Sequence, residues 1–235
     1  MHGISSEQLR ALKEFDTALL ANTIGYIDPT PAHEYYMAGT IQSVTPALGP
    51  TVGIAYTCEM DTSTPEGDAD MDLYWRQLEE IDREELPVLW VVKTVGDRPD
   101  HECVLGDGMA KTLHAAGCIG AVTDGGVRDV VGLLTIPFAA YCRLKTIHHT
   151  NMRVRSVGQP VHLGGITIRT GDVLHADSGG VIRVPRGSID ALPGKAIRML
   201  AFERDAHLLL RRADLTPAQK RDRVGAMLRD YGFSS

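Results

Sequence analysis

Apolar side chains near the start of the chain recur at the spacing of an amphipathic helix, three to four positions apart. These residues are Leu9, Leu12, Phe15, Leu19 and Leu20. Serines precede them, and a serine side chain can accept hydrogen bonds from the free amides of a first helical turn. The pattern predicts one helix that ends near Gly25.

The next apolar runs are shorter and predict strands. Residues 37–60 alternate small, β-branched and Gly/Pro positions, which predicts two strands joined by a turn at 47–50. Residues 63–87 are acidic at first and then take on a helical pattern, so they predict a loop that runs into a helix. The nearly continuous apolar run at 88–95 is typical of a strand buried on both faces.

The second half of the chain alternates helix, strand and turn signals. Residues 108–117 predict a helix with Gly117 as its C-cap, and 118–126 predict a strand that leads into a Gly-Gly turn. A further strand is expected at 136–143. Residues 152–185 carry closely spaced glycine turns, which are typical of a compact β layer.

The C-terminal part, 189–235, is predicted to be a helical tail that packs on its own or a neighbouring subunit. Pro217 follows Thr216, a favourable start for the last helix. No internal repeat, low-complexity segment or linker divides the chain. The sequence therefore predicts a single mixed α/β domain over residues 1–235 with a helical tail.

Composition and charge narrow the class of protein. The chain has 235 residues, 43% of them hydrophobic, and a formal net charge of -6. Without a basic stripe, a nucleic-acid partner is disfavoured, and no apolar run is long enough to span a membrane. The N-terminus lacks the pattern of a signal peptide, so a cytoplasmic location is expected. The cysteines show no CxxC pair and are expected to be buried free thiols: Cys58, Cys103, Cys118 and Cys142.

One end of the 108–117 helix carries candidate chemistry. Asp107 precedes the helix, and its ordinary role there would be an N-cap. Gly108 follows, and a glycine lets an outside group approach the backbone. The amides of Gly108 and Met109, with the helix dipole behind them, form a candidate site for a carboxylate.

Arg128 and Asp129 follow the 118–126 strand, where side chains often face a site. The arginine fork matches a carboxylate, although both residues could also be surface charges paired with others. Adjacent side chains on an extended backbone point to opposite faces, so the side chains of Arg128 and Asp129 both reach one pocket only if the chain turns there. Arg128, Asp129 and Asp107 together suit an anionic substrate and a hydrated Mg²⁺ or Mn²⁺. These are the groups that C–C cleavage next to a 2-oxo acid requires.

Twenty residues separate Asp107 from Arg128, which gives the motif Asp-X20-Arg-Asp. This motif resembles the signature of class II pyruvate aldolases of the 4-hydroxy-4-methyl-2-oxoglutarate/4-carboxy-4-hydroxy-2-oxoadipate type, within the RraA-like family. The resemblance covers roughly residues 9–210 and includes "FDTALLANTI", "HAAGCIGAVTDGGVRDV", "IPFAAYCR" and "PVHLGGITIRTGDVLHADSGGVIRVP". It implies a three-layer ββα sandwich similar to a swivelling domain.

The resemblance also implies roles for individual residues. Asp129 would hold Mg²⁺ or Mn²⁺, mostly through waters, and Arg128 would bind the pyruvyl oxygens and stabilise the enolate. Asp107 would orient a metal-bound water that acts as acid and base, and the Gly108 and Met109 amides would hold the substrate carboxylate. The family assembles as homotrimers or homohexamers with sites at subunit interfaces. There Glu203 of a neighbouring subunit is the candidate to approach the metal waters.

Three functions remain open at this stage. The leading hypothesis is a metal-dependent lyase that cleaves a small 2-oxo acid through a pyruvate enolate, by retro-aldol cleavage, oxaloacetate decarboxylation or both. The alternative is a non-catalytic RraA-type regulator that binds and inhibits a ribonuclease; that branch tends to lack the second Asp, which this chain keeps as Asp129. The third is a lyase or hydrolase for another polar acid.

Two segments depart from the family pattern: the acidic 61–86 segment and the loop that contains His148 and His149. If either borders the site, the substrate could differ. Adjacent histidines without further ligands at suitable spacing favour solvent exposure or hydrogen bonding over a zinc site. His33, in a loop, is likewise expected to form hydrogen bonds. Asp172 and Asp177, in Gly-rich segments, are expected to be turn residues.

Overall fold

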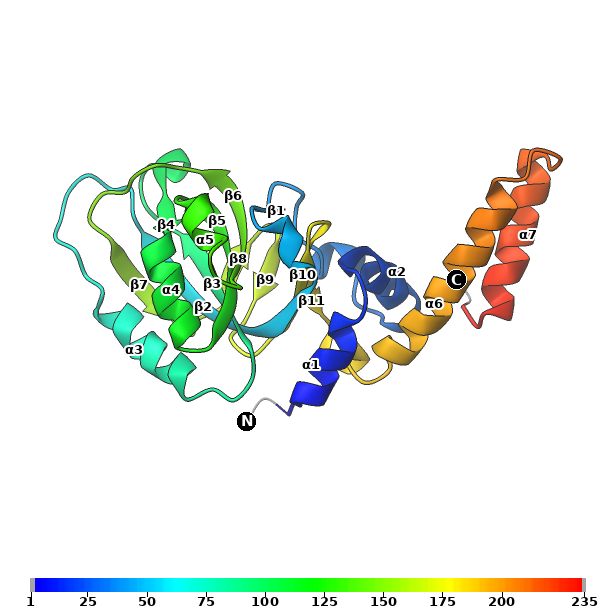
Figure 1. Cartoon of the computed structure of the whole chain (residues 1–235), viewed down its shortest axis with the longest axis horizontal. Helices are drawn as coiled ribbons and strands as arrows, with labels where there is room; N and C mark the ends of the chain where they lie inside the picture. Colours follow the sequence, from blue (N-terminus) through cyan, green and yellow to red (C-terminus); the bar gives the residue numbers. More distant parts are fainter. Residues whose placement is uncertain (1–2, 234–235) are drawn as a thin grey trace.

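A β-sheet with helices on one side forms the body of the protein in the computed structural model, which describes residues 3–233 (Figure 1). The helices are α1 (Ser6–Lys13), α2 (Thr17–Ile27), α3 (Asp72–Asp82), α4 (Asp107–Ala115), α5 (Val130–Leu133), α6 (Leu192–Leu210) and α7 (Pro217–Asp230). The strands are β1 (Gln42–Ser43), β2 (Thr51–Asp61), β3 (Val88–Thr94), β4 (Cys103–Leu105), β5 (Cys118–Val127), β6 (Ala139–Lys145), β7 (Arg153–Val157), β8 (Val161–Leu163), β9 (Ile166–Ile168), β10 (Val173–Asp177) and β11 (Gly180–Val184).

The main sheet has the strand order β1-β6-β5-β3-β2-β10-β11, with β4 added to β5 and β7 added to β2. Its centre, from β2 through β3 and β5 to β6, is parallel. The strands β10 and β7 join β2 in antiparallel pairing, and β8 pairs with β9 in a separate hairpin. Parallel strands buried on both faces explain the continuous apolar run of β3.

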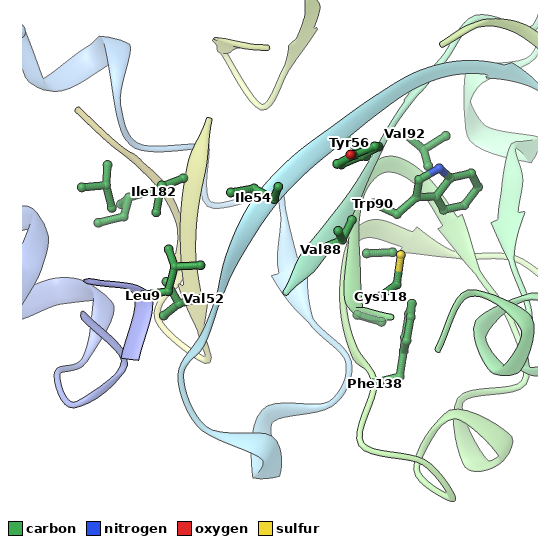
Figure 2. Close-up of a cluster of buried hydrophobic side chains, with 14 of the residues drawn as sticks. Leu9, Val52, Ile54, Tyr56, Val88, Trp90, Val92, Cys118, Phe138 and Ile182 are labelled. Carbon is green, nitrogen blue, oxygen red and sulfur yellow. The ribbon is translucent and has the colours of Figure 1, made fainter. Parts of the chain in front are cut away.

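Alternate side chains of the central strands serve two separate cores. On β3, Val88, Trp90 and Val92 pack on the helix side of the sheet, whereas Leu89 and Val91 pack against the β8–β9 hairpin. This alternation follows from the two-residue period of a strand. Figure 2 shows the helix-side core, where β2, β3 and β5 meet helix and loop side chains. Hairpin, sheet and helices form the expected three-layer ββα sandwich.

The predicted N-terminal helix is two helices, so the expectation of one continuous helix was wrong. Asp16 lies between them in extended backbone conformation (φ -76°, ψ 158°) and caps α2, its side chain accepting a hydrogen bond from the Leu19 amide at 2.7 Å. The break turns the chain so that Leu9 and Leu12 of α1, and Leu20 of α2, all reach the core. Helical spacing alone carried no sign of the break, but the aspartate between two apolar runs was a capping signal.

Replacing Asp16 with alanine is expected to lower the free energy of unfolding by about 1 kcal/mol, because the first-turn amide of α2 loses its acceptor. Urea unfolding followed by circular dichroism would measure the change. Asp16→Asn keeps an acceptor oxygen and should be nearly neutral. Equal losses in both variants would show that the charge, rather than the cap, is what matters.

The remaining elements mostly confirm the sequence pattern, with one topological correction. β1 and β2 do not pair across residues 47–50; instead β1 pairs with β6 at the edge of the sheet, and a 3-10 turn at Pro46–Leu48 precedes β2, which lies between β3 and β10. Thr216 caps α7 ahead of Pro217, as expected.

α6 packs on α2 of the same chain, and with α7 it extends away from the sandwich as a helical arm (Figure 1). Within residues 3–233, none of the helices has the length and apolar character needed to span a membrane.

Candidate active site

The site starts where β4 gives way to α4. Gly106 is the N-cap of α4, and Asp107 is its first residue, so Asp107 does not act as the cap itself. The first hydrogen bond in the helix runs from the Ala110 amide to the Gly106 carbonyl, at 3.0 Å. The earlier amides, those of Gly108 and Met109, therefore have no carbonyl partner within the helix and carry the positive end of its dipole.

The other half of the site starts where β5 ends, but the expected turn at Gly125-Gly126 is absent. β5 continues through both glycines to Val127. A Cβ on Gly126 would lie 2.5 Å from Thr146 Oγ1 and 2.6 Å from the Glu102 carbonyl oxygen. Gly126 is thus explained by the close approach of neighbouring chain segments rather than by a turn.

The chain turns instead at Asp129, which adopts a left-handed conformation (φ 56°, ψ 37°). It is the only non-glycine residue with positive φ in the part of the chain that the structure describes. Aspartate tolerates this region better than most residues, and such strained positions cluster at functional sites. This turn is what lets two neighbouring side chains, those of Arg128 and Asp129, reach the same side.

Strand register brings the two halves together. β4 and β5 are parallel neighbours, and Leu105 is opposite Val127, so Gly106 and Arg128 follow at the same edge of the sheet. A Cβ on Gly106 would lie 3.0 Å from both Arg128 Nε and Asp129 Oδ2. Arg128 Nε and Asp129 Oδ2 are 3.3 Å apart.

A cavity of about 280 Å³ opens at this point. Its walls contain five of the six residues that the sequence predicted for the site, all except Glu203, together with others that it did not predict. The lining residues are Cys103, Leu105, Gly106, Asp107, Gly108, Met109, Arg128, Asp129, His149 and Met152. A Cβ on Gly108 would meet no atom within 4 Å, so this backbone is open to a ligand.

The charges in the cavity keep Asp107 ionised. Its Oδ2 lies 2.6 Å from Lys111 Nζ, and this hydrogen bond is the main cause of a pKa below the usual value for an aspartate. The Gly108 amide and the positive charge of Arg128 lower this pKa further. Asp129 is about half exposed, and its side chain makes no capping bond to α5. Two carboxylates and one arginine thus face a small space.

A second cavity of about 250 Å³ lies on the other side of the Arg128–Asp129 turn. Its lining includes Ile147, whose side chain is among the most exposed apolar groups of the protein. Val131 of α5 and Leu134, directly after this helix, are likewise exposed next to the same turn. An apolar rim of this kind is typical of a surface that another chain covers.

Several residues that the sequence raised lie elsewhere. Glu203 is on α6 and, within one chain, accepts a hydrogen bond from Asn22 of α2 at 3.1 Å rather than lining the cavity. Asp124 pairs with Lys93 and accepts from the Thr94 amide, which makes it structural. Asp172 and Asp177 accept hydrogen bonds from nearby amides in their turns, and His33 is exposed. All four cysteines are buried free thiols, and one of them, Cys103, also lines the cavity: Cys58, Cys103, Cys118 and Cys142.

His149 and Met152 are the site residues that the sequence did not single out as such. They come from the loop of residues 146–152, between β6 and β7, and only its long-range contacts bring that loop to the cavity. His148, next to His149 on the chain, is exposed and does not line the cavity. The available signal was the departure of this loop from the family pattern.

Comparisons with known proteins identify the family. A family model described as RraA-like, Aldolase/RraA, matches residues 27–183. The chain belongs to the RraA-like family. The matched segment contains Asp107, Arg128, Asp129 and His149, whereas Glu203 lies beyond it.

Among RraA-like relatives, a Halalkalibacterium halodurans protein named "Putative 4-hydroxy-4-methyl-2-oxoglutarate aldolase" is 36% identical over 90 residues. This alignment spans 38% of the present chain and 41% of that relative, less than half of each.

Two solved structures share the RraA-like architecture. An uncharacterized protein from Pseudomonas syringae pv. tomato str. DC3000 has a TM-score of 0.68 at 23% identity, with 93% of this chain and 98% of that chain covered. RraAS2 of Streptomyces coelicolor, described as an unusual member of the RNase ES inhibitor RraA protein family, has a TM-score of 0.68 at 21% identity, with 87% and 97% covered. At these identities the likeness concerns the fold alone.

Proposed function

We propose that this protein is a divalent-metal-dependent lyase that cleaves a small 2-oxo acid through a pyruvate enolate. The observation that carries the proposal is that Asp107, Arg128 and Asp129 meet at one cavity of about 280 Å³, beside the free amides of α4. A cavity of this size suits a small molecule. The name of the 36% identical relative supports an aldolase.

Arg128 and the start of α4 would hold the common half of such substrates. The first-turn amides of Gly108 and Met109, aided by the helix dipole, suit the C1 carboxylate. The Arg128 guanidinium would bind the pyruvyl oxygens and stabilise the negative charge that develops as the enolate forms. Asp107, kept ionised by Lys111, would hold by hydrogen bonding the water that transfers protons.

The acidic groups fit a hydrated ion rather than a cage of protein ligands. In residues 3–233 no group of three or more His, Cys, Asp or Glu side chains could hold a metal. Mg²⁺ commonly binds through one or two carboxylates and keeps several waters, a demand that Asp129 with Asp107 nearby can meet. Mg²⁺ or Mn²⁺ would be held by Asp129, with Asp107 and a neighbouring subunit's Glu203 reaching it through water, and would supply Lewis acidity toward the substrate carbonyl.

Retro-aldol cleavage of 4-hydroxy-4-methyl-2-oxoglutarate and decarboxylation of oxaloacetate both leave the pyruvate enolate. In each reaction the bond next to C3 breaks, and its electron pair moves into the C1–C3 fragment. Residues that stabilise this fragment therefore serve both reactions. The proposal accordingly includes either activity or both.

A homotrimer or homohexamer with sites at subunit interfaces is part of the proposal. The exposed Val131, Leu134 and Ile147 around the second cavity support a partner surface at the site. Apolar side chains are also exposed along α6, on the arm that leaves the sandwich: Ile197, Leu200, Leu208 and Leu210. These support contact of the arm with a neighbouring subunit.

Metal removal tests the proposal directly. With Mg²⁺ or Mn²⁺, the protein is expected to release pyruvate from 4-hydroxy-4-methyl-2-oxoglutarate or oxaloacetate, and EDTA should lower the rate at least ~100-fold, since Lewis-acid stabilisation contributes several kcal/mol. Restoring Mg²⁺ should restore the rate. Asp129→Asn should be insensitive to both treatments. Absence of metal-dependent turnover of these acids, and of a wider panel of 2-oxo acids, would refute the proposal.

The ribonuclease regulator remains the alternative, since RraAS2 is described as belonging to an inhibitor family. The retained Asp129 favours the enzyme. A regulator would form a stable complex with a ribonuclease and would show no shift in melting temperature with Mg²⁺. A pull-down with purified ribonuclease, combined with thermal unfolding with and without Mg²⁺, separates the two functions.

A further inference from the structure

The 146–152 loop contributes two side chains to the cavity, and one of them has unused hydrogen-bonding capacity. His149 is half-buried, and its Nδ1 lies 2.7 Å from the Thr150 carbonyl oxygen. A carbonyl oxygen only accepts, so Nδ1 carries the proton of the neutral ring, and the lone pair is on Nε2. No group of residues 3–233 forms a hydrogen bond with this Nε2.

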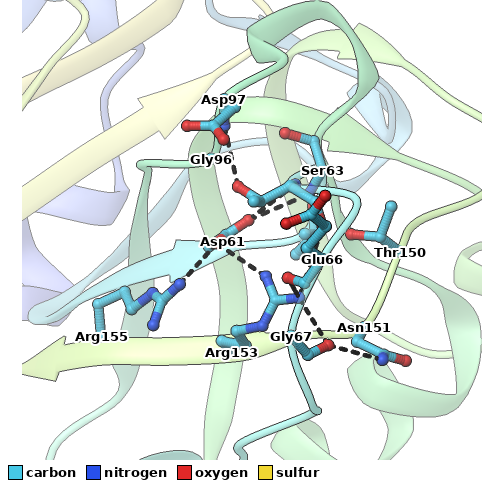
Figure 3. Close-up of polar contacts among 12 residues, drawn as sticks. Asp61, Ser63, Glu66, Gly67, Gly96, Asp97, Thr150, Asn151, Arg153 and Arg155 are labelled. Atoms are coloured by element: carbon cyan, nitrogen blue, oxygen red, sulfur yellow. Dashed lines mark hydrogen bonds and ion pairs between the residues drawn. The ribbon is translucent and has the colours of Figure 1, made fainter.

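The loop that carries His149 is fastened at the following residues. The Thr150 amide donates to the Thr62 carbonyl at 2.8 Å, and the Asn151 side chain donates to the Gly67 carbonyl at 2.9 Å. The Met152 carbonyl accepts from the Asp70 amide at 2.9 Å. Figure 3 shows Asn151 joined to Gly67 within this polar cluster.

Arg153, directly after the loop, binds the same acidic segment. Its guanidinium donates to the carbonyls of Glu66, Gly67 and Asp68 and to the Asp61 carboxylate (Figure 3). The two segments that depart from the family pattern are therefore joined to each other. A loop held in this way presents a side chain at a fixed position, which is what substrate recognition requires.

We propose that His149 is a substrate-binding residue whose Nε2 accepts a hydrogen bond from the hydroxyl group on the departing half of a 4-hydroxy-2-oxo acid. The proposal rests on the proposed lyase function and concerns its specificity. Arg128 and the α4 amides bind the half that becomes pyruvate, so an additional polar group of the cavity wall is available to the other half. Met152 adds apolar surface beside His149 for carbon substituents.

The inference is tested by comparing two substrates that differ in this hydroxyl. Leucine at position 149 removes the acceptor, and His149→Leu is expected to lower kcat/KM for 4-hydroxy-4-methyl-2-oxoglutarate by about 10- to 100-fold, the effect of one lost hydrogen bond in a desolvated site. Oxaloacetate lacks the hydroxyl, and its decarboxylation should fall less than about threefold, within ordinary packing effects. His149→Gln, which keeps an acceptor, should restore much of the loss.

His148→Leu is the matched control, because it changes the neighbouring exposed histidine and should affect neither substrate. Equal losses for both substrates in His149→Leu, or no loss for either, would overturn the inference while leaving the lyase function intact. If the wild-type protein turned over no 2-oxo acid with Mg²⁺ or Mn²⁺, the proposed function and this inference would fail together. Melting temperatures of the variants would show that each is folded.

Discussion

Replacing Arg128 with lysine is expected to lower kcat/KM for 2-oxo acid cleavage by about 10²- to 10³-fold, the usual effect of losing a group that stabilises a developing oxyanion. Lysine keeps the charge, so the loss would arise from geometry. A guanidinium binds two oxygens at once, whereas an ammonium acts as a point charge. The Arg128 amide donates to the Leu105 carbonyl at 2.9 Å, and its side chain lies against Gly106, so the fork is held at the start of α4.

The split between kcat and KM identifies the role. Charge on the enolate oxygen grows in the transition state, so kcat should fall more than KM rises. Pyruvate formation followed by a coupled assay would supply both constants, and exchange of the pyruvate methyl protons would report enolate formation alone. Arg83→Lys, at an exposed position after α3, is the control and should be neutral. A loss confined to KM would assign Arg128 to ground-state binding only.

The candidate site could be predicted from the sequence because the carboxyl ends of neighbouring parallel strands lie at the same edge of the sheet. β4 and β5 are neighbours in register, so the residues that follow each strand meet whatever the length of the helix between them. The spacing from Asp107 to Arg128 spans one helix and one strand. The motif therefore has a structural reason as well as a family resemblance.

The details of the turn could not be predicted in the same way. Gly125 and Gly126 are common turn residues, yet they lie in a strand, where a side chain on Gly125 would meet Thr94 and one on Gly126 would meet Thr146 and the Glu102 carbonyl. The turn instead uses the left-handed Asp129, where the sequence shows no glycine. Local propensity was overridden by contacts between segments distant in the chain.

His149 escaped the sequence analysis for a related reason. The spacing of His148 and His149 favours solvent exposure or hydrogen bonding over a zinc site, and does not indicate that either residue lines a cavity. Both histidines lie in a loop whose position depends on contacts with Thr62, Gly67 and Asp70. No periodic pattern encodes such contacts, because a loop position is set by individual hydrogen bonds rather than by a repeating face.

A buried ion pair between Arg153 and Asp61 lies beside those contacts, and breaking this pair is expected to have a large effect on stability. Arg153→Met should lower the free energy of unfolding by about 3–5 kcal/mol, because it removes the buried cation beside the Asp61 carboxylate and leaves only the half-exposed Arg155 paired with it. Arg153 Nη1 lies 3.0 Å from Asp61 Oδ2, with side chains that are 5% and 2% exposed. The variant also removes the guanidinium that donates to the Glu66 and Asp68 carbonyls of the acidic segment.

Arg155 provides a matched control, since it pairs with the same carboxylate at 2.9 Å but is 51% exposed. Arg155→Met should cost about 1 kcal/mol or less, because an exposed pair is screened by solvent. Urea unfolding of both variants at neutral pH would measure the difference. Equal costs would contradict the view that burial of Arg153, rather than charge alone, stabilises this cluster.

The pH dependence of stability tests the same carboxylate independently. Burial raises the pKa of Asp61, but hydrogen bonds from the Thr64 amide and Arg155 outweigh it and lower the pKa from 3.8 to about 2. The stabilisation is therefore present above about pH 4 and is lost as the pH falls through about 2, a total of about 2 kcal/mol. Asp61→Asn should remove this acid-side loss, while lowering stability at neutral pH because Arg153 then lacks its anion. An Asp61→Asn variant whose stability still fell as steeply between pH 4 and pH 2 would assign the acid sensitivity to other carboxylates.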